Sequence, residues 1–304
     1  MLLDDADPQV RLQVAYTLGK QDTDFGGTLE NLMRVALEIY AYAQALGEDR
    51  LKNPQDDLTS VMMHAVVDGE RIVGEWRSHT SAMRTADEHA VWLIQLMKME
   101  GIDPNSITDA IIGSVVPNAN FNLRRLCTRY FNTEPMFIGD ANVKHGIVIR
   151  GVGAGADRIC NTVGASLMFP KTPVVVVDFG TATNFDVVDE EGAYCGGAIA
   201  PGPNLSIEAL VNAAALLPRI IVEKPAQVIG TTTVACMHTG VFWGYVGLIE
   251  GIVTRIKSEF GKPMKVVSTG GLAPVFDGHI SVIDQIATDI TARGLIEIFR
   301  RSKA

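Results

Sequence analysis

The sequence Val174-Val175-Val176-Val177-Asp178-Phe179-Gly180-Thr181-Ala182-Thr183 predicts the fold of the chain. Four consecutive valines predict a strand buried on both faces, because β-branched side chains favour the extended backbone and no polar residue interrupts the run. An Asp at the end of such a strand, a Gly that lets backbone N–H groups approach a ligand, and two Thr hydroxyls form a cradle for a phosphate or a cation. The alternative is a plain hairpin in which Asp178 only caps the turn.

A second glycine-rich stretch, Gly151-Val152-Gly153-Ala154-Gly155-Ala156-Asp157-Arg158, precedes a predicted helix. Asp157 is a candidate acceptor for a hydroxyl proton, and the forked guanidinium of Arg158 suits a carboxylate. The same residues also fit a helix start with a solvated Asp/Arg pair. A third interpretation is an NAD-dependent oxidoreductase, because Gly151-x-Gly153-x-x-Ala156 after Ile147–Arg150 imitates a dinucleotide-binding turn, with Asp178 as ribose ligand.

Around these stretches the chain alternates strands and helices, which predicts an α/β fold. Thr85 and Glu88 form a capping box that opens a helix ending near Gly101. The order of hairpin, strand and long helix repeats loosely, so we expect two similar α/β halves, residues 68–170 and 171–304, with a cleft between them. The other predicted strands are at 71–76, 109–116, 136–138, on both sides of 191–192 and at 265–268, and the other helices are near 123–130, 204–216, 232–260 and 282–301.

Residues 1–67 have a different pattern from the rest of the chain. Val10, Val14 and Leu18 recur at helical spacing, and the apolar residues between Leu29 and Leu46 form a second helical stripe. The sequence therefore predicts a helical N-terminal segment before the two α/β halves.

Composition and charge restrict the possible partners. The chain has 304 residues and a formal net charge of −9, with no block rich in Lys and Arg, so it lacks the basic surface that binds a nucleic-acid backbone. Its longest aliphatic run, Val174–Val177, is far shorter than the ~20 residues of a membrane span. The cysteines are widely spaced and fit neither a zinc knuckle nor a disulfide scaffold. We expect a soluble cytoplasmic protein with small-molecule ligands, reduced thiols and no nucleic-acid or membrane partner.

Further motifs follow one another in the second half of the chain: Asp178-x-Gly-Thr-Ala-Thr, Gly196-Gly197-Ala198-Ile199-Ala200-Pro201-Gly202, Thr231-Thr232-Thr233, Gly240-x-x-x-Gly244 and Ser268-Thr269-Gly270-Gly271-Leu272. In this order they resemble type III pantothenate kinases, and the resemblance extends over about residues 68–301. It implies two RNase H-like halves of the actin and sugar-kinase type with ATP in the cleft. It also implies a cytoplasmic homodimer that phosphorylates pantothenate to 4'-phosphopantothenate, the first step of coenzyme A biosynthesis.

The resemblance implies roles for particular residues. Asp157 would be the general base on the pantothenate hydroxyl, and Asp178 would bind a monovalent cation, K⁺ or NH₄⁺. Mg²⁺ would accompany ATP, since phosphoryl transfer depends on positioning and charge neutralisation more than on covalent catalysis. The implied pantothenate-binding residues are Gly155, Ala156, Asp157, Arg158 and Thr233, and the implied ATP-binding residues are Gly180, Thr181, Thr183, Gly270 and Gly271.

One family motif is missing from its expected place. Family members open with a strand that runs into Asp-x-Gly-Asn-Thr, the first phosphate motif, whereas here Met1-Leu2-Leu3 leads into the helical segment. Asp24-Phe25-Gly26-Gly27-Thr28 matches the pattern without a preceding strand, and Leu58–Val67 is a candidate for the vacant strand position. We therefore expect weak ATP affinity and reduced kinase activity. The alternative is a non-catalytic, kinase-like protein that binds a small molecule.

Overall fold

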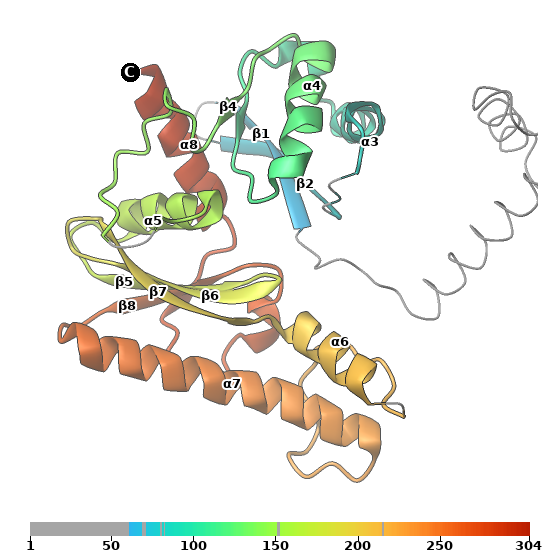
Figure 1. Cartoon of the computed structure of the whole chain (residues 1–304), viewed down its shortest axis with the longest axis vertical. Coiled ribbons are helices and arrows are strands. Elements are labelled where there is room, and N and C mark those ends of the chain that lie inside the picture. The colour runs from blue at the N-terminus through green and yellow to red at the C-terminus, as the bar shows by residue number, and fades with distance from the viewer. Residues whose placement is uncertain (1–60, 69–70, 80, 82, 151–152, 215) are drawn as a thin grey trace, which may run out of the picture. The chain divides into compact units, whose positions relative to one another are not determined.

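The computed structural model describes residues 61–304, except for residues 69–70, 80, 82, 151–152 and 215 (Figure 1). The helices predicted within residues 1–60 and the motif at residues 24–28 lie outside the described residues. The chain divides into two compact units, Met1–Asp57 and Leu58–Ala304, and the described residues belong to the second.

The second half of this unit is built around the strand β5 (Val174–Phe179), whose four valines are completely buried. β5 pairs antiparallel with β6 (Ala182–Val188) and parallel with β8 (Lys265–Thr269). β7 (Tyr194–Pro201) and β9 (Gln285–Ile286) complete a sheet of order β7-β6-β5-β8-β9. The predicted central strand and the hairpin that follows it are confirmed.

The long helix α7 (Thr233–Phe260) covers one face of this sheet (Figure 1). Its Phe242 and Ile249 are completely buried in a cluster with Val175 and Val177 of β5. Full burial of an aliphatic or Phe side chain contributes ~1.5–3 kcal/mol, so this face holds much of the core. The shorter helix α6 (Pro203–Ala213) lies beside α7, and both predicted helices are confirmed.

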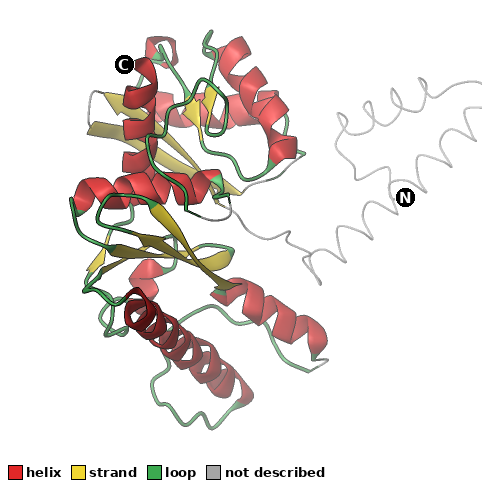
Figure 2. Ribbon diagram, turned by 60° about the vertical axis from the view of Figure 1, so that its left-hand side comes forward, coloured by secondary structure: helices red, strands yellow, loops and turns green. Residues whose placement is uncertain are grey.

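Two helices cross on the opposite face of the sheet, α5 (Ala156–Met168) and α8 (Ile290–Lys303). Figure 2 shows the sheet between the α5 layer and α7. The crossing is close because glycines remove the side chains at the contact. A Cβ at Gly164 would lie 2.2 Å from the carbonyl oxygen of Ile290, and Gly294 approaches the α5 backbone in the same way. The backbones of the two helices therefore touch.

The closing helix is shorter than the sequence predicts. The apolar spacing indicates a helix over residues 282–301, but α8 starts at Ile290 and β9 precedes it. β9 pairs parallel with β8, and the Asp284 carboxylate accepts a hydrogen bond from the Val266 N–H at 2.8 Å. Sheet pairing therefore overrides the helical pattern before residue 290.

The first half contains two strand pairs. β1 (Val61–Asp68) and β2 (Arg71–His79) form an antiparallel hairpin. β3 (Ile111–Ile112) and β4 (Met136–Phe137) pair in parallel. Within residues 61–304, apart from the gaps given above, no strand joins the two pairs into one sheet.

Two expectations for this half are wrong. The strand predicted over residues 109–116 is reduced to the two residues of β3, because β4 is the one strand described as pairing with it. The segment at residues 58–67 does not fill the vacant strand position, because β1 forms the hairpin with β2 and pairs with no other described strand.

Two helices pack in the first half, α3 (Ala86–Met99) and α4 (Asn120–Tyr130). α3 begins at the predicted capping box: the Glu88 N–H donates to the Thr85 hydroxyl at 3.3 Å, and the Thr85 N–H donates to the Glu88 carboxylate at 2.7 Å. Such a cap contributes ~1 kcal/mol. The core that these helices share with β2 consists of Trp76, Ala86, Ala90, Leu93, Met97 and Leu126.

The cysteines differ in burial: Cys127 and Cys160 are buried, Cys195 is partly exposed and Cys236 is exposed. All four cysteines are free thiols. Burial raises the pKa of Cys127 to about 11 and that of Cys160 to about 12. Among the described helices, none combines the length and the apolar character needed to cross a membrane.

Candidate functional site

A cavity of about 1650 Å³ lies where β5 and β8 end. The turn after β5, residues 178–182, and the loop after β8, residues 269–272, line it, together with Asp157 from the first turn of α5. The structure thus brings six predicted site residues to one cavity: Asp157, Asp178, Gly180, Thr181, Gly270 and Gly271.

Asp178 is held in place by both crossing helices. Nδ2 of Asn161, in α5, donates to Oδ2 of Asp178 at 3.0 Å, and Oγ1 of Thr291, in α8, donates to Oδ1 of Asn161 at 2.6 Å. The other carboxylate oxygen of Asp178 lies beside Gly270, where a Cβ would come within 2.7 Å of it. Burial raises the pKa of Asp178, the hydrogen bond from Asn161 opposes this, and the charge of Asp157 adds to the rise.

The turn after β5 lines the cavity with Gly180 and Thr181. Gly180 and Thr181 separate β5 from β6. Gly270 approaches this turn closely: its φ is +91°, and a Cβ there would lie 2.6 Å from the carbonyl oxygen of Phe179, so only glycine fits. Oγ1 of Thr181 is buried and has no hydrogen-bond partner among the described residues. A buried hydroxyl of this kind beside a cavity suits a phosphate oxygen.

Asp157 occupies the second position of α5, after the N-cap Gly155. Its carboxylate turns back toward the cap, since a Cβ at Gly155 would lie 2.7 Å from Oδ1 of Asp157. Glycine at position 155 therefore leaves the space that the carboxylate uses.

Arg158 points into the protein. Nη1 donates to the Tyr194 hydroxyl at 2.9 Å, Nη2 donates to Oδ1 of Asn184 at 3.2 Å, and Nε lies 3.6 Å from Oδ1 of Asp186. Only 16% of the Arg158 side chain is exposed, so the interpretation as a solvated pair with Asp157 is wrong. Sequence reasoning missed these partners. The available signal was the presence of Asn184 and Asp186 in an otherwise apolar strand.

Asp186 is a further carboxyl group, which lies beside Arg158. Its side chain is completely buried, and burial raises its pKa to about 7. The negative charges of Asp157 and Asp178 also raise this pKa, whereas the positive charge of Arg158 lowers it. Oδ2 of Asp186 is buried with no hydrogen-bond partner among the residues described.

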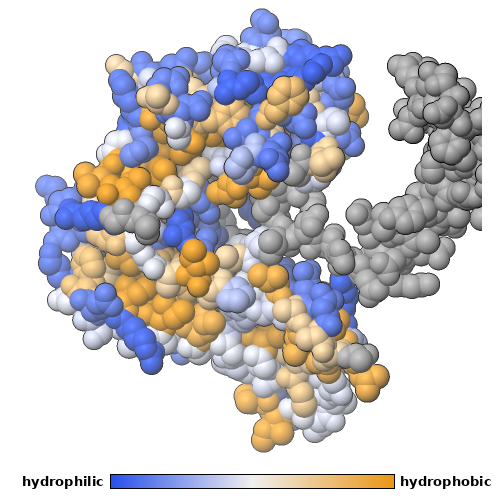
Figure 3. Space-filling model, viewed as in Figure 1, coloured by the Kyte–Doolittle hydropathy of each residue, from blue (hydrophilic) through white to orange (hydrophobic). Residues whose placement is uncertain are grey.

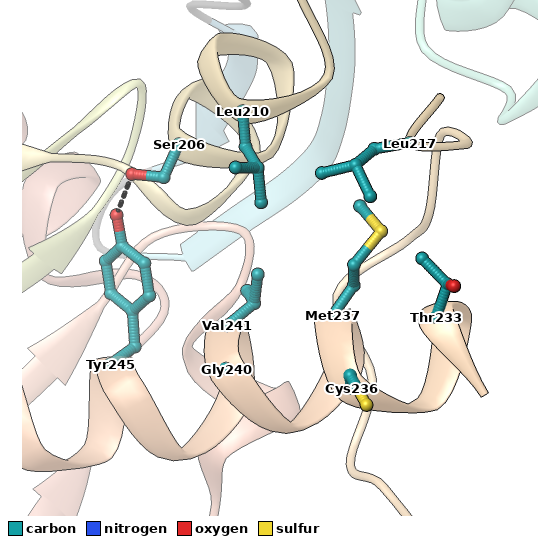
Figure 4. Close-up of a pocket in the computed structure, with 9 residues that line it drawn as sticks. All are labelled: Ser206, Leu210, Leu217, Thr233, Cys236, Met237, Gly240, Val241 and Tyr245. Atoms are coloured by element: carbon teal, nitrogen blue, oxygen red, sulfur yellow. Dashed lines mark hydrogen bonds between the residues drawn. The ribbon is translucent and has the colours of Figure 1, made fainter. Parts of the chain in front are cut away.

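Five predicted site residues do not line this cavity. Gly155, Ala156, Arg158 and Thr183 lie beside lining residues, and Thr183 is completely buried. Thr233 lines a separate pocket of about 510 Å³ between α6 and α7 (Figure 4). Within a single chain, Thr233 is therefore not part of the cavity that contains Asp157.

The dinucleotide-binding interpretation is wrong. β5 passes through a two-residue turn into the antiparallel strand β6, whereas a dinucleotide-binding unit requires a crossover helix at this point. Ile147–Arg150 contributes an isolated bridge between Ile149 and Tyr194 instead of a strand.

Among the described residues there is also no group of three or more His, Cys, Asp or Glu side chains that could hold a metal ion.

This chain is similar in sequence to known proteins of a single family. A sequence model described as type III pantothenate kinase matches residues 59–255. The chain belongs to the type III pantothenate kinase family. The curated type III pantothenate kinase of Paramagnetospirillum magneticum is 54% identical over 244 residues, which cover 79% of this chain and 94% of that protein. That of Caulobacter vibrioides is 53% identical over 245 residues, which cover 79% and 93%.

As a member of the type III pantothenate kinase family, the protein is a kinase, and its described residues form an α/β fold. The family match begins at residue 59, before the predicted boundary at residue 67, so β1 lies inside the family region. Similar solved structures include a ROK family glucokinase from Streptomyces griseus in complex with glucose and AMPPNP, with a TM-score of 0.43 and 13% identity over 81% of this chain and 97% of that chain. An inorganic polyphosphate/ATP-glucomannokinase from Arthrobacter sp. strain KM has a TM-score of 0.40 and 13% identity over 80% and 94%.

Proposed function

We propose that this protein transfers the γ-phosphoryl group of ATP to the hydroxyl group of pantothenate, giving 4'-phosphopantothenate and ADP in the first step of coenzyme A biosynthesis. The observation that supports this most is the meeting of Asp157 with the Asp178–Thr181 turn in one cavity of a type III pantothenate kinase. A proton acceptor and a phosphate cradle then face the same space.

Asp157 is the proposed general base. Its carboxylate takes the proton of the pantothenate hydroxyl as that oxygen forms a bond to the γ-phosphorus, and the bond from the γ-phosphorus to the β–γ bridging oxygen breaks to release ADP. Base catalysis of this kind contributes ~10²–10⁴-fold in rate. Asp157 is partly exposed at the cavity, so a bound hydroxyl can reach it.

The residues after β5 and β8 are the proposed ATP contacts. The Thr181 hydroxyl would hydrogen-bond a phosphate oxygen, and Gly180, Gly270 and Gly271 would let the triphosphate approach the backbone. Asp178 is the proposed ligand of K⁺ or NH₄⁺. When bound, Mg²⁺ neutralises phosphate charge. Mg²⁺ needs only one or two carboxylates in addition to phosphate oxygens. It therefore does not require a cluster of three or more ligating side chains, and the described residues contain no such cluster.

Arg158 is the proposed positioning charge for pantothenate. Its hydrogen bonds to Tyr194 and Asn184 hold the guanidinium against Asn184, which lines the cavity. We propose that Arg158 attracts the pantothenate carboxylate through its buried positive charge and does not form a bidentate hydrogen bond with it. The pantothenate contacts of Gly155, Ala156 and Thr233 remain predictions.

A cytoplasmic homodimer is the proposed form of the enzyme, with α6 and the start of α7 at the contact. Leu216, Ile221 and Ile229 are 93%, 71% and 82% exposed near these helices. Figure 3 shows apolar side chains on this part of the surface, and such patches mark interfaces. Light scattering should give twice the chain mass, and Leu216→Asp with Ile229→Asp should give the monomer. A wild-type monomer would contradict the proposal.

The test of the proposed reaction is pantothenate phosphorylation with ATP and Mg²⁺, with and without K⁺ or NH₄⁺. Asp157→Asn should lower kcat about 10²-fold or more while the urea midpoint stays nearly unchanged. Asp87→Asn is a matched control, because Asp87 has the same position in the first turn of α3 but does not line the cavity. Unchanged turnover in Asp157→Asn would exclude Asp157 as the base. Absence of any phosphorylation by the wild type would favour the non-catalytic alternative.

A further inference from the structure

The two halves share a series of strands and helices. The second half runs β5, β6, β7, α6, α7, β8, β9, α8, with a 3₁₀ turn before β9. The first half runs β1, β2, α3, β3, α4, β4, α5. The hairpin β1–β2 therefore corresponds to β6–β7, and the parallel pair β3–β4 corresponds to β8–β9. No element of the described first half corresponds to β5, which lies between β6 and β8.

The cavity extends to the place where that strand would lie. Val66 and Val67 of β1 and Ile111 and Ile112 of β3 line it, and we call this part the β1–β3 side of the cavity. The total volume of about 1650 Å³ exceeds the ~300–1,000 Å³ of ordinary small-ligand pockets. The walls around this side are apolar, with contributions from Leu93, Met97, Leu123, Leu126, Leu295 and Ile296.

The inner edges of both strand pairs are suited to pairing. β1 pairs only with β2, and β3 only with β4, among the described strands. An edge strand presents a row of backbone N–H and C=O groups that can hydrogen-bond an added strand. A strand here would run antiparallel to β1 and parallel to β3, as β5 does with β6 and β8.

The sequence before β1 is poorly suited to that strand. Two residues separate β5 from β6, and the same spacing before β1 selects Asn53-Pro54-Gln55-Asp56-Asp57-Leu58. Proline removes a ladder donor from a central strand, and burial of two carboxylates is costly. The longest apolar run before β1, Ile39–Ala43, falls inside a stretch whose spacing predicts a helix.

We propose that the β1–β3 side of the cavity binds an extended segment of a different polypeptide, which completes the first-half sheet by strand addition. The segment is apolar and β-branched on both faces, because β5 in the equivalent position is covered on both faces. The stretch before β1 in a second copy of this chain is not the donor, since it has the same Pro54, Asp56 and Asp57. If the segment ends in Asp-x-Gly, its turn enters the cavity opposite Asp178, and this last point rests on the proposed kinase function.

The test uses the full chain and a fluorescein-labelled peptide with the sequence of Val174–Thr183 behind two lysines. Fluorescence anisotropy should show saturable binding, and proline in place of the third valine should weaken it at least tenfold because a ladder donor is lost. Hydrogen exchange should show that the peptide protects the amides of Val66 and Ile111 and leaves those of Val176 and Val267 unchanged.

Equal binding of both peptides, or binding without protection of β1 and β3, would overturn the proposal. Failure of the peptide to bind because these amides are already protected would mean that residues 1–60 fill the position, which would also overturn it. These measurements need neither ATP nor pantothenate. If the peptide binds as expected and no phosphorylation follows, the strand-addition proposal stands and the proposed kinase function fails.

Discussion

The second half of the molecule is organised around a central strand, whereas the first half has two strand pairs beside a cavity. Val176 in β5 is completely buried, while Val66 in β1 and Ile111 in β3 are only partly buried. The helices and the hairpin nevertheless form in both halves. Outer elements of this fold are thus specified locally, by caps and turns, and the central strand contributes the shared core and the turn that lines the cavity.

The largest effect expected is from giving the first half a strand and turn of its own. Replacing residues 4–60 with a short apolar strand that ends in Asp-x-Gly-Asn-Thr leaves β1 intact and should raise kcat/KM for ATP about 10²-fold or more. The physical reason is that a single preorganised donor is worth ~10²-fold and a turn contains several. The measurement is steady-state phosphorylation of pantothenate at varied ATP.

The control for this variant is the same strand with Ala in place of the Asp and Gly of the turn. It should restore the sheet without the activity. An ungrafted chain that already turns over at the rate usual for a metabolic kinase, or equal rates from the two grafts, would show that the phosphates are held by other residues.

The two halves should also respond to pH with opposite signs. Burial raises the pKa of Asp186 to about 7, so its folded form binds a proton more tightly than its unfolded form and gains stability as pH falls from about 7 toward 4. Burial in α3, with the charge of Arg84, lowers the pKa of His89, so the first half loses stability as pH falls below its unfolded value near 6.5. Each effect is limited to ~1.4 kcal/mol per pH unit.

Urea unfolding of Asp186→Asn and His89→Gln at pH 4.5, 6 and 8 measures these contributions. As the pH falls, the unfolding free energy of the wild type should rise relative to that of Asp186→Asn. Over the same pH range it should fall relative to that of His89→Gln. The same sign for both differences would contradict the assignment of a buried acid to one half and a buried neutral His to the other.

The smallest effect expected is a difference between two valine truncations. Val176→Ala removes two methyl groups from a completely buried position and should cost ~2–3 kcal/mol of unfolding free energy. Val66→Ala removes them at the cavity wall, where the side chain is partly exposed, and should cost ~1 kcal/mol or less. Equal costs from urea unfolding would mean that β1 is as well packed as β5.

Features governed by neighbouring residues were predictable from sequence. The Thr85/Glu88 capping box and the valine strand with its Gly180 turn depend on residues within a few positions of one another. The contacts that hold the site are different. Asn161 and Thr291 are 130 residues apart in sequence, and nothing local indicates that α5 and α8 cross so as to bring them together.

The position of β1 was missed for a related reason. An alternating strand pattern indicates that a segment pairs, but it does not say with which neighbour. Arg158 shows the same limit, because a solvated and a buried guanidinium have the same local sequence. Its partners come from two strands that the sequence predicted without their register.

The glycine contact between α5 and α8 acts as a mechanical pivot. With backbone against backbone at Gly164, the helices can rotate about the contact, but sliding is blocked because neither backbone can be compressed. Along α5, Asp157 lies about 10 Å from Gly164 and Asn161 only about 4.5 Å. A given rotation would therefore move Asp157 through about twice the arc of the amide that holds Asp178. Such a rotation would displace the Asp157 carboxylate while leaving that of Asp178 nearly still.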